Sequence, residues 1–506
     1  MSLLITVLCG IGTIVSLVFV FIRYRMSYWK QRQIPHDKPA WFLGNIQEHL
    51  HQSDAIKKLY NKFIGTGPFC GLYYFMTPAI VALDLDFIKD VLIKDFNKFV
   101  ERGFFYNEID DPLSANLFAL EEKQWRQMRH KLSPTFTANK IKTMFPGVID
   151  VGHRFVETLS EIIDGADGSE IIEVKDLNAR FTTDVIATCA FGIECNSLAD
   201  PNAQFRKYGR IVFEEPTYHS VIMGFMQSCP KLARKLKLRL IRKDVEDFFL
   251  QAVRRTVEYR EQNNIQKNDF MSILIDVKNN KSFVTEDGQQ ISTGLTMEEV
   301  AAQAFLFWIA GFETSSATMS YAIYALARNT DVQEKLRTTI DEVLEKHNGE
   351  LTYESLKEMH YLDQVFDETL RMYTVVPTLQ RIANTDYYAS ADKKYKIDKG
   401  TLIFIPIEAI HSNPDIYPNP TKFDPERFSP EEKAKREALA YLPFGEGPRN
   451  CIGLKFGRML ASIGLALLIK NFKFSVCEET PKDLQFDPAQ ILLVTPHGIR
   501  VKVEKV

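Results

Sequence analysis

The chain has 506 residues, 45% of them hydrophobic and 25% charged, and its formal net charge at neutral pH is −3. This composition is that of a globular protein, and the near balance of charge argues against nucleic-acid binding through overall positive charge. Seven cysteines without a CxxC pair, and scattered histidines without an HExxH motif, argue against a disulfide scaffold and a zinc hydrolase.

The chain begins with an uncharged, mostly apolar run from Leu3 to Ile22, long enough to cross a bilayer as one helix. Four basic side chains follow it directly and none precedes it, which places the following chain on the cytosolic side. A cleaved signal peptide would need a basic region before the run and a small-x-small site after it, and neither is present. We therefore expect a retained membrane anchor over residues 1–25.

The rest of the chain shows no low-complexity tract, internal repeat or long Gly/Ser linker. We expect a proline-bearing linker over residues 26–45 and one large domain over 46–506. Apolar spacing predicts helices and short strands in a mainly α fold with minor β structure. The predicted helices are Asp84–Lys94, Thr143–Ile163, Asp244–Asn263 and Met297–Arg328, and the predicted strands are Ile80–Leu83 and Thr401–Ile405.

One segment, Ser228–Lys243, carries seven basic side chains, no acidic one, and interleaved leucines. This pattern is typical of a basic amphipathic helix that makes a second contact with an anionic membrane surface. An ordinary solvated surface helix would show the same pattern, and the sequence leaves both readings open. The basic residues are Lys231, Arg234, Lys235, Lys237, Arg239, Arg242 and Lys243.

The densest chemistry lies in the segment Pro443–Gly453, which reads PFGEGPRNCIG. Its glycines and prolines predict an irregular loop that turns backbone N–H groups toward the sulfur of Cys451, and a helix after the loop adds positive dipole there. Apolar Phe444 and cationic Arg449 suit a flat, apolar cofactor that bears carboxylates. A lone cysteine is usually structural, but this pattern is too specific for that reading.

The segment FGEGPRNCIG resembles the haem-binding loop of cytochrome P450 enzymes, with Cys451 at the position of the sulfur ligand to iron. Further motifs follow the order of that family along the chain. They are Trp125–Arg129 (WxxxR), Ala310–Ser315 (AGxxT), Glu368–Arg371 (ExxR) and Pro425–Phe428 (PERF). The resemblance spans essentially the whole chain and implies the cytochrome P450 fold, with a single large haem domain behind one transmembrane helix.

The resemblance also assigns roles to individual residues. Haem b (iron protoporphyrin IX) would be bound through Cys451 as the metal ligand, and Glu368, Arg371 and Arg427 would form a structural network behind the loop. Thr314 and Glu313 would be catalytic and deliver protons, in a helix turn loosened by Gly311. The other cofactor-binding positions are Trp125, Arg129, Arg381, Arg449 and Phe444.

Finer features resemble the insect microsomal branch of the family, family six. They are Asp110–Ala115, Lys131–Phe136 and Gly311–Ser316. Two positions depart from the family pattern: Thr374 stands where proline is usual, which could loosen a turn at the pocket, and Lys455 stands where arginine is usual. The resemblance predicts a pocket lined by Phe105, Phe118, Phe213, Phe225, Phe305, Leu379 and the region of Ile491.

The implied reaction inserts one oxygen atom from O2 into a lipophilic small molecule, such as a plant toxin, an insecticide or an endogenous lipid. This chain has no convincing nucleotide-binding loop, so the electrons would come from NADPH through the separate NADPH-cytochrome P450 reductase, with cytochrome b5 as a further candidate partner. The expected location is the endoplasmic reticulum membrane, with the domain on the cytosolic face. The alternatives are a haem-thiolate isomerase or dehydratase, and a haem or lipophile carrier without enzymatic activity.

Overall fold

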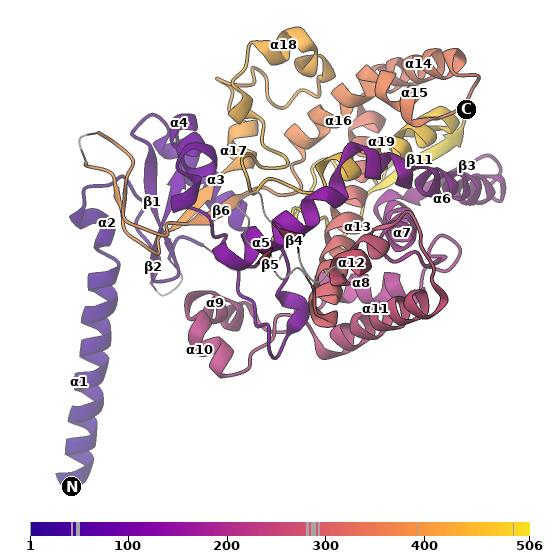
Figure 1. Cartoon of the computed structure of the whole chain (residues 1–506). Coiled ribbons are helices and arrows are strands. Elements are labelled where there is room, and N and C mark those ends of the chain that lie inside the picture. Colours follow the sequence, from indigo (N-terminus) through magenta and orange to yellow (C-terminus); the bar gives the residue numbers. More distant parts are fainter. Residues whose placement is uncertain are drawn as a thin grey trace.

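The computed structural model describes residues 2–41, 44–46, 51–279, 283–284, 290–291, 294–391, 393–488 and 490–506. One long helix projects from a helix-rich body that contains two small sheets and two short hairpins (Figure 1). The mainly helical fold with minor β structure that the sequence predicts is therefore confirmed.

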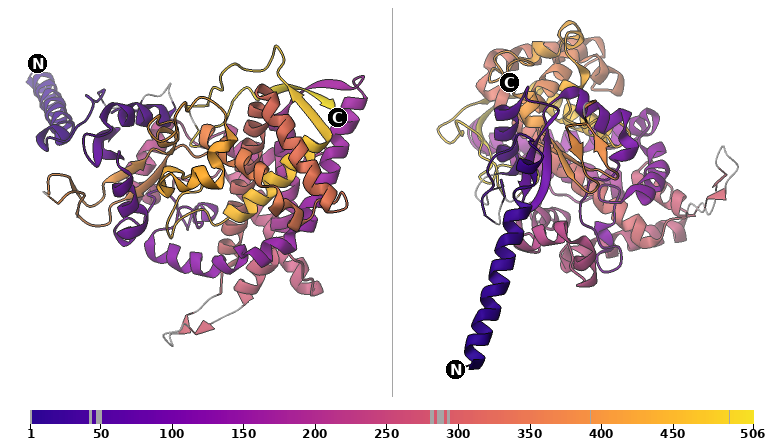
Figure 2. Two further views of the ribbon diagram at one scale, coloured as in Figure 1. Left: turned by 90° about the horizontal axis from the view of Figure 1, so that it is seen from above. Right: turned by 90° about the vertical axis from the view of Figure 1, so that its left-hand side faces the viewer.

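The projecting helix, α1 (Ser2–Arg25), has the features of a membrane span. Its segment Ile5–Arg25 has a mean hydropathy of 2.6, and its apolar side chains from Ile5 to Phe21 are exposed. Both views of Figure 2 show it standing clear of the body. By length and composition this helix can anchor the protein in a membrane, as the sequence predicts.

The chain is fixed to the body immediately after the anchor, through the short helix α2 (Tyr28–Gln31). The side chain of Trp29 is fully buried, and its Nε1 donates a hydrogen bond of 3.0 Å to the carbonyl oxygen of Leu72. A Cβ atom at Gly71 would lie 2.4 Å from the Trp29 ring, so the indole fits only over a glycine. The first part of the predicted linker is thus built into the body.

The larger sheet has the strand order β1-β2-β9-β6. Its parallel pair, β2 (Thr77–Ala82) and β9 (Leu402–Ile405), confirms the two predicted strands, although β2 begins before Ile80. The outer strands are β1 (Phe69–Tyr74) and β6 (Leu379–Ile382), and β6 carries Arg381 opposite Ile403. The second sheet has the order β10-β11-β3 and is formed by β10 (Phe472–Ser475), β11 (Arg500–Lys505) and β3 (Ser169–Glu173).

Helix α13 (Met297–Arg328) runs through the main hydrophobic core and contacts α7, α11, α12, α14, α16 and α19. Its start is fixed by a capping box, in which Thr296 and Glu299 satisfy each other's backbone N–H groups. The other long helices are α3 (Gln52–Phe63), α5 (Glu122–Leu132), α6 (Ala138–Asp164), α7 (Val174–Ile186), α8 (Gln204–Glu214), α9 (Ser220–Ser228), α11 (Lys243–Asn263), α12 (Phe270–Asn279), α14 (Thr330–Lys346), α16 (His360–Met372) and α19 (Leu454–Asn471).

The predicted helices lie where the sequence places them, with one difference in geometry. The segment Asp84–Lys94 begins as α4 (Leu85–Lys89), capped by the Asp84 carboxylate, which accepts the N–H of Asp86 at 2.8 Å. It continues over Asp90–Lys94 as a wider π-helical turn. The segments predicted at 143–163 and 244–263 lie within α6 and α11, and the long helix predicted at 297–328 is α13.

The basic segment Ser228–Lys243 does not form the single helix that the sequence predicts. A short helix, α10 (Pro230–Lys235), ends before Lys237, whose φ of 55° is left-handed. Beyond this point backbone groups bond to another part of the chain: the Asp111 carboxylate accepts the N–H groups of Leu240 and Ile241, at 2.7 and 3.0 Å. These tertiary hydrogen bonds replace those of a helix, which corrects the prediction for this segment.

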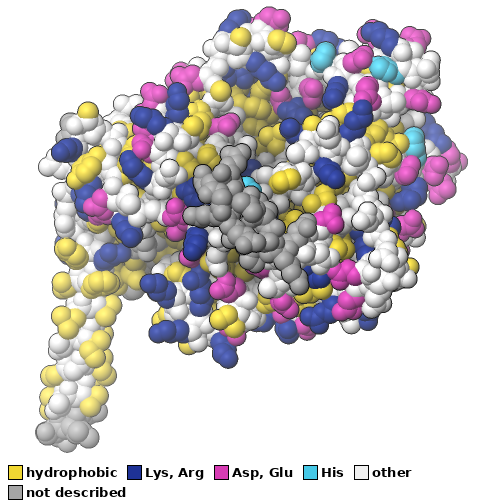
Figure 3. All heavy atoms as spheres, viewed as in Figure 1, with side chains coloured by type: hydrophobic (Ala, Val, Ile, Leu, Met, Phe, Trp, Pro, Cys, Tyr) yellow, Lys and Arg dark blue, Asp and Glu magenta, His cyan; other side chains and the backbone are white. Residues whose placement is uncertain are grey.

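Helices α9 and α10 lie on the side of the body from which α1 projects, as the views of Figures 1 and 2 agree. Lys and Arg side chains gather along this edge in Figure 3. Large apolar side chains are exposed between them, with Val221 57%, Leu232 48% and Leu236 57% accessible. The basic character predicted for this region is thus combined with an apolar surface beside the anchor.

Candidate haem site

The loop before α19 holds Cys451 by backbone hydrogen bonds. The N–H of Cys451 donates to the Phe444 carbonyl oxygen at 2.8 Å, and the N–H of Gly445 donates to that of Leu442 at 3.0 Å. Gly447 has a φ of 76°, and a Cβ atom there would lie 1.9 Å from the Leu92 carbonyl oxygen. Gly445 and Gly447 both have left-handed φ angles, and Gly447 is also required by close backbone contact.

The environment of Cys451 combines solvent accessibility with deep placement in the body. The residue is exposed by area, yet burial raises the pKa of its thiol. The Gly453 backbone N–H and the cations Arg102 and Arg129 act to lower this pKa, because they favour the thiolate. The sulfur is thus accessible although protein surrounds it, and a bound metal cation would complete the deprotonation that these groups only partly support.

A stripe of accessible residues interrupts the burial of α13. Leu306, Ala310 and Thr314 are spaced four residues apart and lie on one face, whereas most of the surrounding helix is buried. Helix α19, which follows Cys451, packs on α13, with 5.4 Å between the ring centroids of Phe307 and Phe456. The accessible stripe therefore lies on a helix that packs against α19, the helix that follows the loop of Cys451.

The turn around Gly311 is not loosened, contrary to the prediction. Helix α13 is unbroken, and the Thr314 hydroxyl donates to the Ala310 carbonyl oxygen of the preceding turn at 2.6 Å. A Cβ atom at Gly311 would lie 2.5 Å from Cδ1 of Ile186 in α7. Glycine is present here because it lets α7 and α13 approach closely, which sequence spacing alone cannot distinguish from a weak turn.

Four arginines gather around the loop, and their donors bond mainly to backbone oxygens. Arg449 donates to the carbonyl oxygens of Val100 and Leu120, and Arg102 donates to that of Arg449 at 2.9 Å. Arg129 binds the carbonyl oxygen and the side-chain oxygen of Asn450, at 3.0 and 2.9 Å. Arg381 donates to Gln380 O at 2.8 Å.

In the described part of the chain these four cations have no carboxylate within ion-pair distance, although the charge of Glu101 acts on Arg449. Among the residues that the structure describes, none of them forms an ion pair with a carboxylate, and the Nε atoms of Arg381 and Arg449 are buried without a hydrogen-bond partner. Burial and the neighbouring arginines lower the pKa of Arg449 to about 8 and that of Arg381 to about 9. Such a cluster is stabilised by bound anions, and the two propionates of a haem are carboxylates that its free guanidinium donors can bind.

The remaining predicted cofactor-binding residues lie beside this cluster. Trp125 is buried, and the Arg449 guanidinium carbon lies 4.8 Å from its ring centroid. Phe444 stacks parallel to Phe366 of α16, with 6.4 Å between the centroids. The structure thus brings Trp125, Arg449, Phe444 and Cys451 together in and around one loop.

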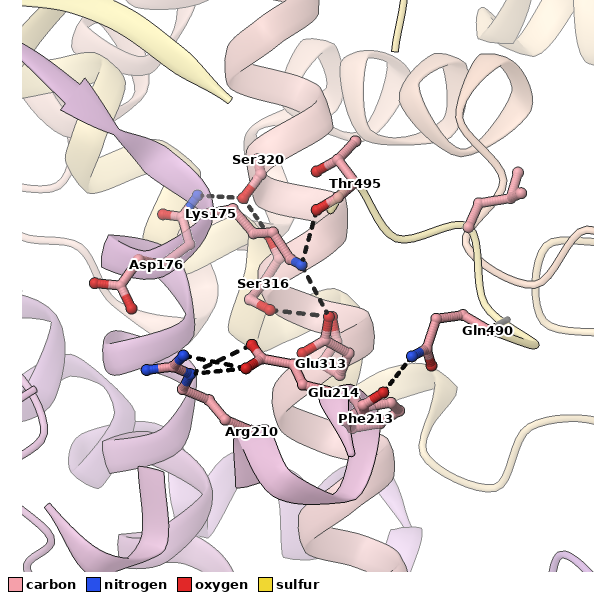
Figure 4. A network of polar contacts seen from close by, with 12 residues as sticks. Lys175, Asp176, Arg210, Phe213, Glu214, Glu313, Ser316, Ser320, Gln490 and Thr495 are labelled. Atoms are coloured by element: carbon pink, nitrogen blue, oxygen red, sulfur yellow. Dashed lines mark hydrogen bonds and ion pairs between the residues drawn. The ribbon is translucent and has the colours of Figure 1, made fainter. Parts of the chain in front are cut away.

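Glu313 lies on a different face of α13 from Thr314. Its carboxylate is buried with Oε1 3.8 Å from Nζ of Lys175, and Lys175 also donates to the Thr495 carbonyl oxygen at 3.3 Å (Figure 4). Burial raises the pKa of Glu313, while Lys175 and Arg206 oppose this shift. Among the described contacts none joins the Glu313 and Thr314 side chains, so the predicted pair is adjacent in sequence without being directly bonded.

The structural network predicted from ExxR and PERF is confirmed. Arg371 forms two hydrogen bonds with the Glu368 carboxylate, at 2.7 and 2.8 Å, and both side chains are buried. Nε of Arg427 lies 3.5 Å from Oε1 of Glu368. This network fixes the start of the segment that leads to the loop.

The predicted pocket residues range from buried to exposed, with Phe213, Phe225 and Leu379 half-buried. Phe305 is core, 5.0 Å from Phe249 between ring centroids, and Phe105 is buried in a small cluster with Met226 and Ala233. Phe118 and Ile491, by contrast, are 41% and 63% accessible. A sequence motif can mark a pocket region, but it cannot tell which aromatic rings in that region are packed in the core.

Some residues of the site carry no motif that would reveal them. Arg102 belongs to the cation cluster, and its guanidinium lies 4.4 Å from the Phe118 ring centroid. Lys175, at the start of α7, is the cation nearest Glu313. Both are single basic residues in ordinary contexts, and only the tertiary structure brings them to the site.

The cytochrome P450 family model matches residues 34–503, so the chain belongs to the cytochrome P450 family and is a haem-thiolate monooxygenase by class. Its relatives include family-six enzymes of flies. It is 48% identical to cytochrome P450 6a9 of Drosophila melanogaster, over 97% of this chain and 98% of that protein. It is 46% identical to cytochrome P450 6a2 of the same fly, over the full length of both, and 43% identical to cytochrome P450 6A1 of Musca domestica, over 99% and 98%.

The unpaired donor of Arg381 leads to a test of the cation cluster. We expect Arg381→Gln to release haem about tenfold faster or more, because a charge-assisted hydrogen bond contributes ~1.5–3 kcal/mol. The rate is measured as transfer of haem to an excess of a haem-scavenging protein. Arg126→Gln is the matched control, because Arg126 lies on the surface of α5 and pairs with Glu122. Equal release rates in both variants would contradict the role of Arg381.

Proposed function

We propose that this protein is a membrane-anchored monooxygenase in which Cys451 is the sulfur ligand of haem b. The observation that carries the proposal is an accessible but enclosed cysteine in a glycine-shaped loop, beside four arginines that form no ion pair with a carboxylate among the described residues. Arg102, Arg129, Arg381 and Arg449 would hold the propionates, with Trp125 beneath Arg449 and Phe444 beside the cysteine. When bound, a thiolate-ligated haem supplies the chemistry that splits dioxygen.

Thr314 and Glu313 would divide the handling of protons between two faces of α13. Thr314 lies on the accessible stripe, where its hydroxyl can exchange its bond to Ala310 for one to a water molecule. Glu313 is buried with a raised pKa, so it can hold a proton closer to neutral pH than an ordinary glutamate. Ordered water would have to connect the two groups, since their side chains are not bonded to each other.

The substrate would be a lipophilic small molecule, either a xenobiotic such as a plant toxin or an insecticide, or an endogenous lipid. The accessible apolar side chains of Leu306, Phe118 and Ile491 support an apolar pocket. Electrons would come from NADPH through the membrane-bound NADPH-cytochrome P450 reductase, with cytochrome b5 as a further partner. Exposed Lys455, in the first turn of α19 after the cysteine loop, offers such a donor a positive charge.

The first test of this function is the difference spectrum of the reduced, CO-bound protein. Wild type should give a strongly red-shifted Soret band, which Cys451→Ala should lose because the thiolate is removed. Cys229→Ala should keep the band, since Cys229 is an exposed cysteine between α9 and α10. A red-shifted band that survives in Cys451→Ala would remove the ligand assignment.

The proton-handling role of Glu313 predicts an uncoupled enzyme. With reductase, NADPH and a lipophilic probe substrate, we expect Glu313→Gln to lower the product formed per NADPH by about a hundredfold while the CO spectrum stays unchanged, because the buried acid is lost. Glu298→Gln is the control, since Glu298 lies on the same helix and pairs with Arg254 at 3.7 Å. Unchanged coupling in Glu313→Gln would contradict the proposal.

We further propose that the protein resides in the endoplasmic reticulum membrane with its body on the cytosolic side, and that the surface of α9 and α10 touches the bilayer. The basic side chains after α1 support this orientation. The exposed Leu232 and Leu236 among lysines and arginines, on the side from which α1 projects, support the second contact.

This surface can be probed with a tryptophan at Leu236 in the full chain reconstituted in lipid nanodiscs. In anionic lipid, brominated acyl chains should quench the fluorescence added by Leu236→Trp, because the side chain enters the bilayer. Glu431→Trp, at an exposed position of α18 (Pro430–Ala434) on the opposite side of the body in Figure 1, should not be quenched. Absence of quenching at position 236 would leave α1 as the sole membrane contact proposed.

A further inference from the structure

The Thr374 side chain belongs to a buried series of hydrogen bonds that connects α16 to the loop of Cys451. The Thr374 hydroxyl oxygen lies 2.9 Å from Nδ1 of His411 and 2.6 Å from the Leu370 carbonyl oxygen. On the other side of the ring, Nε2 of His411 lies 3.0 Å from the backbone nitrogen of Leu442. All of these side chains are buried, so the contacts are shielded from water.

The chemistry of the groups fixes the direction of each bond. The Leu442 N–H can only donate, so Nε2 of His411 is the acceptor and carries no proton. Burial and the nearby Arg371 lower the pKa of His411 to about 3, so the ring is neutral at pH 7 and its proton is on Nδ1. Nδ1–H therefore donates to the Thr374 oxygen, whose own hydrogen goes to Leu370 O.

The chain continues through the backbone to the cysteine. The Leu442 carbonyl oxygen accepts the N–H of Gly445, and the Phe444 carbonyl oxygen accepts the N–H of Cys451. The His411 ring also stacks on that of Tyr441, with 5.3 Å between centroids and 26° between planes. The His411 carbonyl oxygen accepts from Arg371 at 3.0 Å, which fixes the residue from the side of α16.

We propose that Thr374 and His411 are positioning residues that hold the loop of Cys451 in register with α16 and keep its sulfur directed as a ligand. This inference rests on the proposed ligand role of Cys451. The hydroxyl at position 374 is the group that links the Leu370 carbonyl oxygen to the His411 ring. The sequence suggested that Thr374 could loosen this turn. In the proposed role its side chain fastens the turn instead.

The test compares Thr374→Val with Thr374→Ser in the full-length holoenzyme. Valine removes the hydroxyl at nearly constant shape, whereas serine keeps it. Thr369→Val is the matched control, because the buried Thr369 hydroxyl lies on α16, shortly before position 374, and its hydrogen bond among the described residues goes to Val365 O of the preceding turn. A general loss of stability from a buried valine would affect both valine variants.

We expect amide hydrogen exchange of the peptide containing Leu442 and Cys451 to accelerate about tenfold in Thr374→Val alone. The share of CO complex with an unshifted Soret band should also rise severalfold in that variant, while Thr374→Ser behaves as wild type. Equal exchange rates and equal spectra in the two variants at position 374 would overturn the proposal, as would the same changes in Thr369→Val.

Nitrogen-15 NMR of labelled histidines in the wild type is a second measurement that needs no stable valine variant. The His411 signal, assigned by its loss in His411→Gln, should report a neutral ring protonated at Nδ1. A ring protonated at Nε2 would overturn the relay. The ring tautomer is set by Thr374 and Leu442 and not by the iron ligand, so failure of the relay is distinguishable from failure of Cys451 as ligand, which the wild-type spectrum reports.

Discussion

The fully buried ion pair between Glu368 and Arg371 is the interaction on which the region around Cys451 depends. Removing one partner of such a pair leaves an uncompensated charge inside the protein, at a cost of about 3–5 kcal/mol. The remaining polar atoms of the pair bind backbone: Arg371 holds the carbonyl oxygens of His411 and Pro420, and Glu368 accepts the N–H of Asp424. A long segment with little regular structure is thus attached to α16 at several points.

This attachment explains how the loop of Cys451 keeps a defined conformation although it is neither a helix nor a strand. Tyr441 and Leu442 contact His411, and the glycines beyond them take up the backbone angles that bring Cys451 to the start of α19. Rigid positioning of this kind is what a metal ligand requires from its surroundings. The arginines lie around the loop of Cys451, whereas the buried acid Glu313 lies on α13.

The sequence predicts the chemistry of the site better than its geometry. The loop of Cys451, the pair Glu368–Arg371 and the long helix from Met297 to Arg328 could all be predicted, because local residue patterns determine them. The break at Lys237 could not, because hydrogen bonds from the N–H groups of Leu240 and Ile241 to Asp111, distant in sequence, replace those of a helix. The sequence likewise could not predict that Gly311 lets α7 approach α13, or that Arg102 joins the cation cluster. Both depend on side chains from other elements.

The docking of Trp29 against Gly71 has a practical consequence for any shortened form of the protein. A soluble version cut at the end of the predicted linker, after residue 45, would lose an indole that fills a site in the body. Loss of a large buried aromatic side chain typically costs about 3–5 kcal/mol. The cut should fall between Arg25 and Tyr28, so that the globular part keeps Trp29, which packs over Gly71 of β1.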